Sequence, residues 1–168
     1  MAAGATYEPI ATTTTSGNAS LVTFSSIPQT YTDLVLVMQV GTSNSGYVIV
    51  RANGDTDSAS NYGNTYLLGN GSVASSGTNG SLSGFYSSFG ITSSSNLNFI
   101  STMQILNYSN TTTFKTALTR DNLASNGVEA IVACRRSTSA ITSLGIQGTA
   151  FATFTNGSTF TLYGIAAA

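Results

Sequence analysis

The amino-acid sequence predicts an all-β protein, folded as an antiparallel two-sheet β-sandwich of jelly-roll type. Short runs in which apolar and polar residues alternate recur along the chain, separated by clusters of Gly, Asn and Ser. No window shows the sustained i, i+3, i+4, i+7 apolar spacing of an amphipathic helix. Because parallel strands need long, usually helical crossovers, strands joined by such short connections are expected to pair antiparallel. A single large barrel is the alternative arrangement.

Five strands are expected in the first half of the chain, followed by one long excursion. Pro9 places the first strand at a sheet edge or at a strand start. Residues 32–40, TDLVLVMQV, are apolar on both faces and are expected to form a central, covered strand. Residues 70–95 contain few large side chains and many turn formers, so a loop with one strand near residues 82–89 is expected. The five strands are expected at residues 7–15, 19–27, 32–40, 46–54 and 64–71.

Five further strands are expected in the second half, where the alternation is clearer. In the last of them, Phe160 and Leu162 are expected to face the core, with Thr161 and Tyr163 on the opposite side. Gly164 is expected to permit the close approach of another backbone. These strands are expected at residues 96–108, 112–122, 127–136, 140–148 and 158–165, the first two joined by a hairpin at residues 109–111.

The chain length predicts one domain. A chain of 168 residues suits a single hydrophobic core. Residues 1–15 are expected to be an N-terminal segment that can serve as a contact arm, and residues 16–168 a single β-sandwich domain. The N-terminus lacks the basic region and apolar stretch of a secretory signal. The lone Cys134 is expected to be a small buried hydrophobe.

The surface is expected to be polar and almost uncharged. Only 7% of the residues are charged, whereas Ser and Thr together number 51. A protein that packs against copies of itself needs no repulsive surface, so assembly is one interpretation, and a soluble Thr/Ser-rich monomer is the other. The net charge of −1 gives no basic field to attract nucleic acid. No run reaches about 18 apolar residues, so no membrane partner is expected.

The sequence offers no catalytic constellation. It contains no His, which excludes serine triads and typical zinc sites. It also lacks a glycine-rich phosphate loop with its lysine. None of the six carboxylates stands out as one of an acid pair for glycoside hydrolysis. The protein is therefore not expected to be an enzyme, and neither a cofactor nor a metal ion is expected.

Residues 51–64, RANGDTDSASNYGN, form the one suggestive polar cluster. Asn53, Asp55 and Asp57 alternate with other residues, a pattern that can place several oxygens around a hard cation such as Ca²⁺. The match to a twelve-residue calcium loop is poor, because the later Glu and the correctly placed Gly are missing. The alternative is a loop leaving a strand, in which NGD forms a turn and Arg51 pairs with Asp55 or Asp57.

Aromatic residues near the middle of the chain are a second candidate. Exposed aromatic side chains would stack on sugar rings or pack against a partner, whereas buried ones would belong to the core. For Phe85 and Phe89 the expectation is the core or a subunit interface. The candidate partner or oligomer contacts are Tyr7, Pro9, Phe85, Tyr86 and Phe89, and the alternative glycan-contact loop comprises Asp55, Asp57, Tyr62 and Tyr66.

Several segments resemble small structural proteins of tailed bacteriophages, particularly those of cyanobacterial and other aquatic hosts. The resemblance covers nearly the whole chain, and its segments are YEPIATTT, VTFSSIPQTYTDLVLV, RANGDTDSASNY, ILNYSNTTTFKT and GSTFTLYGI. It implies a jelly-roll sandwich, frequently trimeric, that serves as a capsid decoration (cement) protein or as the host-recognising head of a tail fibre or spike. The resemblance supplies no catalytic motif, so it carries no functional residue over to this chain.

The resemblance and the residues together predict a virion structural protein, assembled in the bacterial host cytoplasm. The expected role is a homotrimeric decoration protein that binds the phage major capsid protein or other virion proteins and stabilises the head lattice. The alternative is a tail fibre or spike module that recognises host surface glycans.

Overall fold

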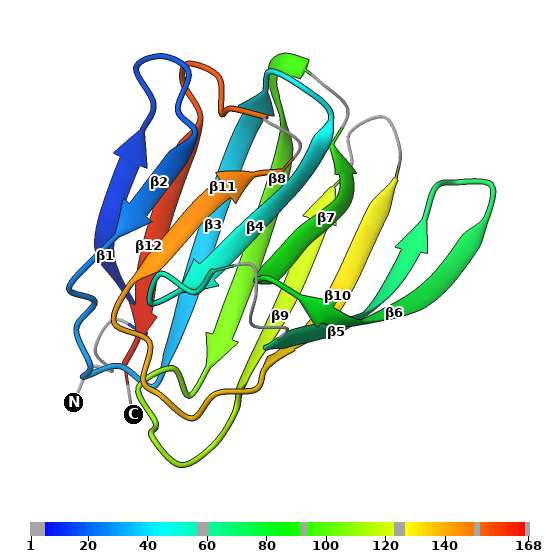
Figure 1. The fold of residues 1–168 in the computed structure, drawn as a ribbon. Coiled ribbons are helices and arrows are strands. Elements are labelled where there is room, and N and C mark those ends of the chain that lie inside the picture. Colours follow the sequence, from blue (N-terminus) through cyan, green and yellow to red (C-terminus); the bar gives the residue numbers. More distant parts are fainter. Residues whose placement is uncertain (1–5, 57–60, 92–93, 123–126, 150–151, 167–168) are drawn as a thin grey trace.

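The computed structural model describes residues 6–56, 61–91, 94–122, 127–149 and 152–166 (Figure 1). These residues form two antiparallel sheets and no helix, so none of them forms a helix able to span a membrane. The predicted all-β, two-sheet antiparallel sandwich is confirmed. The large sheet contains, in spatial order, β1 (Tyr7–Thr14), β12 (Thr159–Ile165), β3 (Asp33–Thr42), β8 (Ser94–Leu106), β9 (Lys115–Asn122), β10 (Val128–Arg135), β5 (Tyr62–Gly69) and β6 (Ala74–Leu82). The small sheet contains β2 (Leu21–Phe24), β11 (Leu144–Gly148), β4 (Gly46–Ala52) and β7 (Phe85–Ile91).

The strand pairs are nested along the chain. The outermost strands, β1 and β12, pair with each other, and further inward β2 pairs with β11, β3 with β8 and β4 with β7. The hairpins β5–β6 and β9–β10 are inserted into this series and widen the large sheet at one end. Figure 1 shows the β5–β6 hairpin projecting beyond the small sheet. The nesting is compatible with two Greek keys wound into a jelly roll, and that topology stays a prediction.

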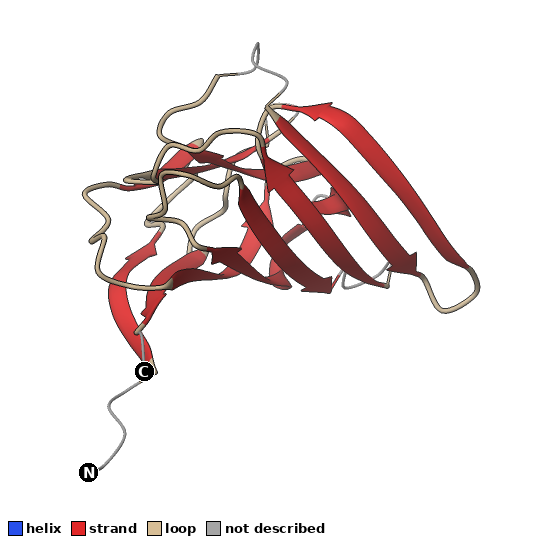
Figure 2. Ribbon diagram, turned by 90° about the horizontal axis from the view of Figure 1, so that it is seen from below, coloured by secondary structure: helices blue, strands red, loops and turns tan. Residues whose placement is uncertain are grey.

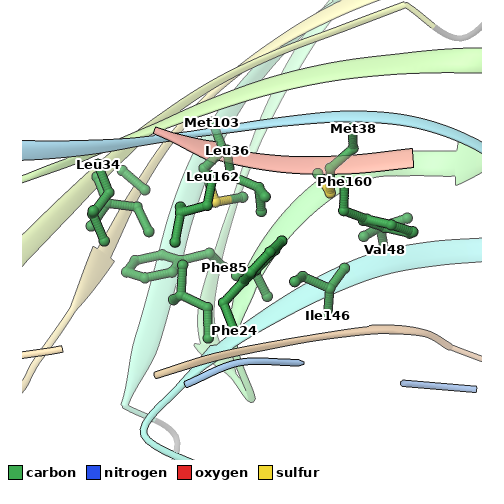
Figure 3. Packing of buried hydrophobic residues seen from close by; sticks show 14 of the residues in the cluster. Phe24, Leu34, Leu36, Met38, Val48, Phe85, Met103, Ile146, Phe160 and Leu162 are labelled. Atoms are coloured by element: carbon green, nitrogen blue, oxygen red, sulfur yellow. The ribbon is translucent and has the colours of Figure 1, made fainter. Parts of the chain in front are cut away.

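The core lies between the two sheets, where every second residue of most strands points inward. Figure 3 shows apolar side chains from the large sheet facing apolar side chains from the small sheet. Phe160 is fully buried, and its ring meets that of Phe154 edge-on at a centroid distance of 4.8 Å. Burial of these side chains is the main free-energy gain of folding. The other residues labelled in Figure 3 are Phe24, Leu34, Leu36, Met38, Val48, Phe85, Met103, Ile146 and Leu162, all 5% exposed or less.

The expected strand at residues 7–15 is confirmed at the sheet edge, because Tyr7–Thr14 pair with β12 from Tyr7 opposite Ile165 to Thr14 opposite Thr159. These residues belong to the large sheet, and a role of residues 1–15 in contacts stays a prediction. One expected segment assignment is wrong. Residues 70–95 are not mainly a loop, because they contain β6 and β7 and the start of β8. Small Ser, Thr and Gly residues give a weak strand pattern, but backbone pairing with a neighbour still makes them strands.

The central strand β3 is fully covered on its inner face and partly covered on its outer face. On the inner face Leu34, Leu36 and Met38 are completely buried. On the outer face Val35 is 6% exposed, Val37 is half-buried and Gln39 is exposed. The small sheet packs on the inner face of the large sheet, and the described residues place no second layer on its outer face. The expectation that β3 is covered on both sides is therefore confirmed at Val35 and wrong at Gln39.

The closing strand β12 has the predicted facing. Phe160 and Leu162 are fully buried, and Thr161 and Tyr163 on the opposite face are half-buried. Gly164 does permit a close approach, but the neighbour is a side chain and not a backbone. A Cβ at this position would lie 2.3 Å from the ring of Tyr31, so any larger residue at 164 would displace that ring.

Truncation of the buried ring of β12 gives a direct test of the core. Phe160→Ala is expected to lower the free energy of unfolding by about 3–5 kcal/mol, because it removes a fully buried ring and leaves a cavity. Thr161→Ala, on the outer face of the same strand, is the control and is expected to cost less than about 1 kcal/mol. Chemical denaturation monitored by circular dichroism measures both. Equal effects of the two substitutions would contradict the assigned faces.

Candidate functional site

In the loop after β4, Asp55 is held by an ion pair with Arg135. Arg135 of β10 donates from Nε to Asp55 Oδ2 at 2.8 Å and from a terminal nitrogen to Oδ1 at 3.3 Å. The Tyr62 hydroxyl donates to the same Oδ2 at 2.6 Å and accepts from the backbone N–H of Ala52 at 3.2 Å. Asp55 therefore joins β4, β5 and β10. The prediction that Arg51 pairs with Asp55 is wrong, and Asp57 lies outside the described residues.

The charges of this cluster follow from burial and pairing. Burial raises the pKa of the Asp55 carboxyl, but the hydrogen bonds from Arg135 and Tyr62 and the charge of Arg135 outweigh it and lower that pKa below its usual value. Burial and the hydrogen bond to Asp55 raise the pKa of the Tyr62 hydroxyl well above its ordinary range. Both groups thus stay in their hydrogen-bonded forms at neutral pH.

The expected glycan loop is not assembled as a binding site by the described residues. Tyr62 is only 1% exposed, and its ring packs edge-on against Phe85 at a centroid distance of 4.9 Å. Tyr66 is half-buried and lies against Gly77 of β6, where a Cβ would come within 2.5 Å of the Tyr66 hydroxyl. Neither ring is free to stack flat on a sugar, so the placement of Tyr62 as a glycan contact is wrong.

The five expected partner contacts are scattered over the molecule. Tyr7 and Pro9 are exposed on the edge strand β1, where Tyr7 meets Tyr163 edge-on at 6.5 Å. Phe85 is completely buried in this chain, so its placement at a partner interface is wrong and its place in the core is correct. Tyr86 is half-buried. The side chain of Phe89 lies outside the described residues.

Tyr86 lies on the outer face of the small sheet, where it borders a shallow polar hollow. Its ring lies 6.0 Å from that of Tyr47. Arg51, Gln147 and Thr149 contribute polar groups to the rim of the same hollow. Rings beside hydrogen-bonding side chains can stack on and hydrogen-bond to a sugar. Of these residues, the sequence singled out Tyr86, as a partner contact, and not the others as a glycan site.

Two carboxylates that the sequence did not single out meet inside the sandwich. Asp121 of β9 lies directly opposite Glu129 of β10, and the two residues are 5% and 4% exposed. The Ser87 hydroxyl of β7 donates to Asp121 Oδ1 at 3.1 Å and lies 2.6 Å from the Ser101 hydroxyl. With so little surface, these carboxylates do not form the open acid pair that a glycoside hydrolase needs. The described residues contain no cluster of three or more metal-ligating side chains.

An acidic residue on the inward phase of a strand is the sequence signal that could have found this pair. Glu129 alternates with Ile131, Ala133 and Arg135, and all four point into the sandwich. Cys134 therefore points outward and is half-buried, so its expected full burial is wrong. In the strand sequence VEAIVACR one phase is entirely apolar and exposed or half-buried, whereas the buried phase contains Glu129 and Arg135. Alternation alone would therefore have chosen the wrong phase as the inner one.

Because Glu129, Ile131, Ala133 and Arg135 of β10 point inward, the apolar residues between them contribute to an exposed apolar surface on the outer face of the large sheet. Half of the ten large hydrophobic side chains that the described residues expose lie on four adjacent strands of this face. They are Leu67 of β5 and Val128 of β10, both 63% exposed, with Val132 at 53%, Ile100 of β8 at 47% and Leu118 of β9 at 40%.

Part of this surface is concave. A hollow of about 830 Å³, here named the outer-face hollow, is bordered by Leu67, Ile100, Arg120, Val128 and Ala130. The register places Leu67, Ala130 and Arg120 in one row across β5, β10 and β9, and Val128 lies one row along. Gly69 opposite Val128 carries no side chain, which deepens the hollow at that end. The hollow is open and apolar, so it suits another macromolecule better than a small polar substrate.

Comparisons with known protein families, curated proteins and solved structures found no match for this chain. A candidate function therefore depends on the surfaces described above.

Removal of the Asp55 carboxylate tests the structural role of the ion pair. Asp55→Asn is expected to cost about 3 kcal/mol at pH 7, because the Arg135 side chain, 4% exposed, would keep its charge without its partner. Since the folded-state pKa of Asp55 lies below its unfolded value, the stabilisation is complete above about pH 4 and is lost as pH falls through the folded pKa. The stability difference between wild type and variant should therefore shrink in acid.

Urea denaturation from pH 7 down to pH 2 measures this difference. Tyr62→Phe is the matched control, because it removes one hydrogen bond to Asp55 and leaves the ion pair with Arg135 in place. It should keep most of the acid dependence of the wild type. A stability difference between Asp55→Asn and wild type that stays constant with pH would contradict the assignment.

Proposed function

We propose that the protein is a non-enzymatic structural protein of a tailed-bacteriophage virion, most specifically a capsid decoration protein that binds the head lattice as a homotrimer. The observation that carries this proposal is the exposed, weakly charged apolar surface on the outer face of the large sheet. Contiguous apolar surface of this kind normally marks a protein–protein contact. The resemblance of the sequence to phage structural proteins supports the choice of a virion as the place of assembly.

The internal chemistry of the sandwich supports a role in adhesion. Among the described residues, buried carboxylates and cations make contacts that hold strands and turns together. Lys115, completely buried, donates from Nζ to the carbonyl oxygens of Asn110, Thr113 and Thr138 at 2.6–3.1 Å. Arg135 holds Asp55. The surface is mostly uncharged and hydrogen-bonding, so its contacts with a capsid lattice would depend little on salt.

A tail fibre or spike module that recognises host glycans is the second candidate. The Tyr47–Tyr86 pair beside Arg51, Gln147 and Thr149 on the small sheet favours it. On this alternative the sugar would lie on the small sheet and not on the Asp55 loop. Binding to a glycan array that is lost in Tyr86→Ala would favour this candidate over the first.

The position and copy number in particles test the proposal. Antibodies to the recombinant protein should label the heads of tailed phages of aquatic bacteria over their whole surface. Quantitative mass spectrometry of the same particles should find hundreds of copies per particle. Label confined to the tail, with a few dozen copies or fewer, would favour the receptor-binding alternative. Absence from purified particles would contradict both.

A further inference from the structure

One exposed cation borders the outer-face hollow. Arg120 projects from β9 beside Ala130 and opposite Thr102, on the exposed face of the sheet. Within the described part of the chain its guanidinium makes neither a hydrogen bond nor an ion pair. Asp121 and Glu129 also border the hollow, but they are 5% and 4% exposed and lie on the inward phase of β9 and β10, so Arg120 is the one charged residue exposed at its rim among the described residues. A partner with apolar side chains beside one carboxylate therefore suits this hollow.

The opposite end of the same sheet carries a group with that character. Tyr7, Glu8 and Pro9 of β1, together with Tyr163 and Ile165 of β12, form a protruding corner that we name the terminal peg. Figure 2 shows the paired ends of β1 and β12 extending away from the body of the sandwich. Tyr7 is 56% exposed. Among the described residues, Glu8 carries the one carboxylate of an exposed residue.

The other described carboxylates are occupied or inaccessible. Asp33 accepts hydrogen bonds through both oxygens, from Gln104 and from the backbone of Asn107. Asp55 is paired with Arg135, and Asp121 and Glu129 are buried. Glu8 is exposed and accepts a hydrogen bond from the Tyr31 hydroxyl at 3.1 Å.

Glu8 and Arg120 do not meet within one chain. In the large sheet β1 is the first strand and β9 the fifth. Four strand spacings of about 4.8 Å separate them by roughly 19 Å across the sheet. A contact between the two groups therefore requires two molecules.

We propose that the terminal peg of one copy docks in the outer-face hollow of a second copy, with Glu8 paired to Arg120. Tyr7 and Pro9 project from one face of β1 and Glu8 from the other, so the peg would enter the hollow edge-on. Tyr7 and Pro9 would cover the apolar wall formed by Leu67 and Val128, and Glu8 would lie on the side of Arg120 and Ile100. The contact joins two different surfaces, so a docked pair of copies keeps one free peg on one copy and one free hollow on the other. A rotation that closes after three copies gives a ring in which every peg and every hollow is filled.

This inference rests on the homotrimer part of the proposed function, not on the virion role. It also differs from the obvious rival, in which two copies stack their outer faces about a twofold axis. In that arrangement the Arg120 side chains of the two copies would approach each other, and Glu8 would take no part.

Charge reversal at each side of the contact tests the pairing. Arg120→Glu and Glu8→Arg are each expected to weaken self-association of the full chain at least tenfold, because like charges would meet in an apolar hollow. The double variant Glu8→Arg/Arg120→Glu is expected to recover trimers. Analytical ultracentrifugation at low and high salt measures all four proteins, and the effect of each single change should diminish at high salt.

Mixing the two single variants distinguishes a head-to-tail contact from a face-to-face one. Each variant carries a surface that is complementary to the other variant, so the mixture should associate although neither variant does so alone. Copies of two kinds alternate only around even-numbered rings. Because the proposed rotation closes after three copies, alternating copies cannot close this ring, and the mixture should form open dimers of one copy of each variant and not closed trimers.

Two controls separate folding and non-specific charge effects from loss of the contact. Thr65→Glu adds a negative charge to an exposed position of the same face, outside the hollow, and should leave association unchanged. Arg120→Lys keeps the charge and should retain most of the association. Thermal melting followed by circular dichroism should show that all variants fold like the wild type.

The inference is overturned by a wild-type protein that stays monomeric at high concentration. It is equally overturned by trimers that survive Arg120→Glu, or by single variants that do not complement each other on mixing. Each of these results leaves the location of the protein on the virion to be decided by labelling and copy number. The opposite result is also distinguishable. If the single variants associate on mixing but antibodies do not label phage heads, the proposed function would be contradicted and the contact between peg and hollow would be retained.

Discussion

Burial of inward-facing side chains between two unequal sheets is the constraint on which the rest of the structure depends. The nested pairs β1–β12, β2–β11, β3–β8 and β4–β7 bring distant segments together, and the core between them forms only when all are in register. A slip of one residue in any of these strands would turn its core side chains outward. Gly164 shows how tight the arrangement is, since Tyr31 fills the space that a side chain there would need.

Polar groups inside the sandwich stabilise the insertions that widen the large sheet. Arg135 and Asp55 connect the inserted hairpins to β4, and Tyr62 adds a hydrogen bond from β5. Lys115 holds the turn between β8 and β9 through the carbonyls of Asn110 and Thr113 and ties it to the segment after β10 through the carbonyl of Thr138. Buried charges of this kind are costly unless they are paired and hydrogen-bonded. They place strands correctly and leave little titratable chemistry at the surface.

The same geometry explains why the exposed apolar side chains lie together. The small sheet covers one face of the large sheet, so the outward residues of β8, β9, β10 and β5 have no covering layer among the described residues. A surface with few charges and several exposed Val, Leu and Ile side chains is poorly suited to an isolated molecule. Contact with another protein would remove this surface from water.

The sequence by itself determined the local features, because strand alternation depends only on neighbouring residues. It predicted the fold class, most strands and the inward facing of Phe160 and Leu162. Tertiary structure decided the rest. Asp55 meets Arg135, 80 positions away, only because β10 lies beside β5. The inward phase of VEAIVACR, the burial of Tyr62 and the gathering of Leu67, Ile100 and Val128 likewise depend on which strands become neighbours. Those long-range pairings arise from packing of the whole chain, which no local pattern encodes.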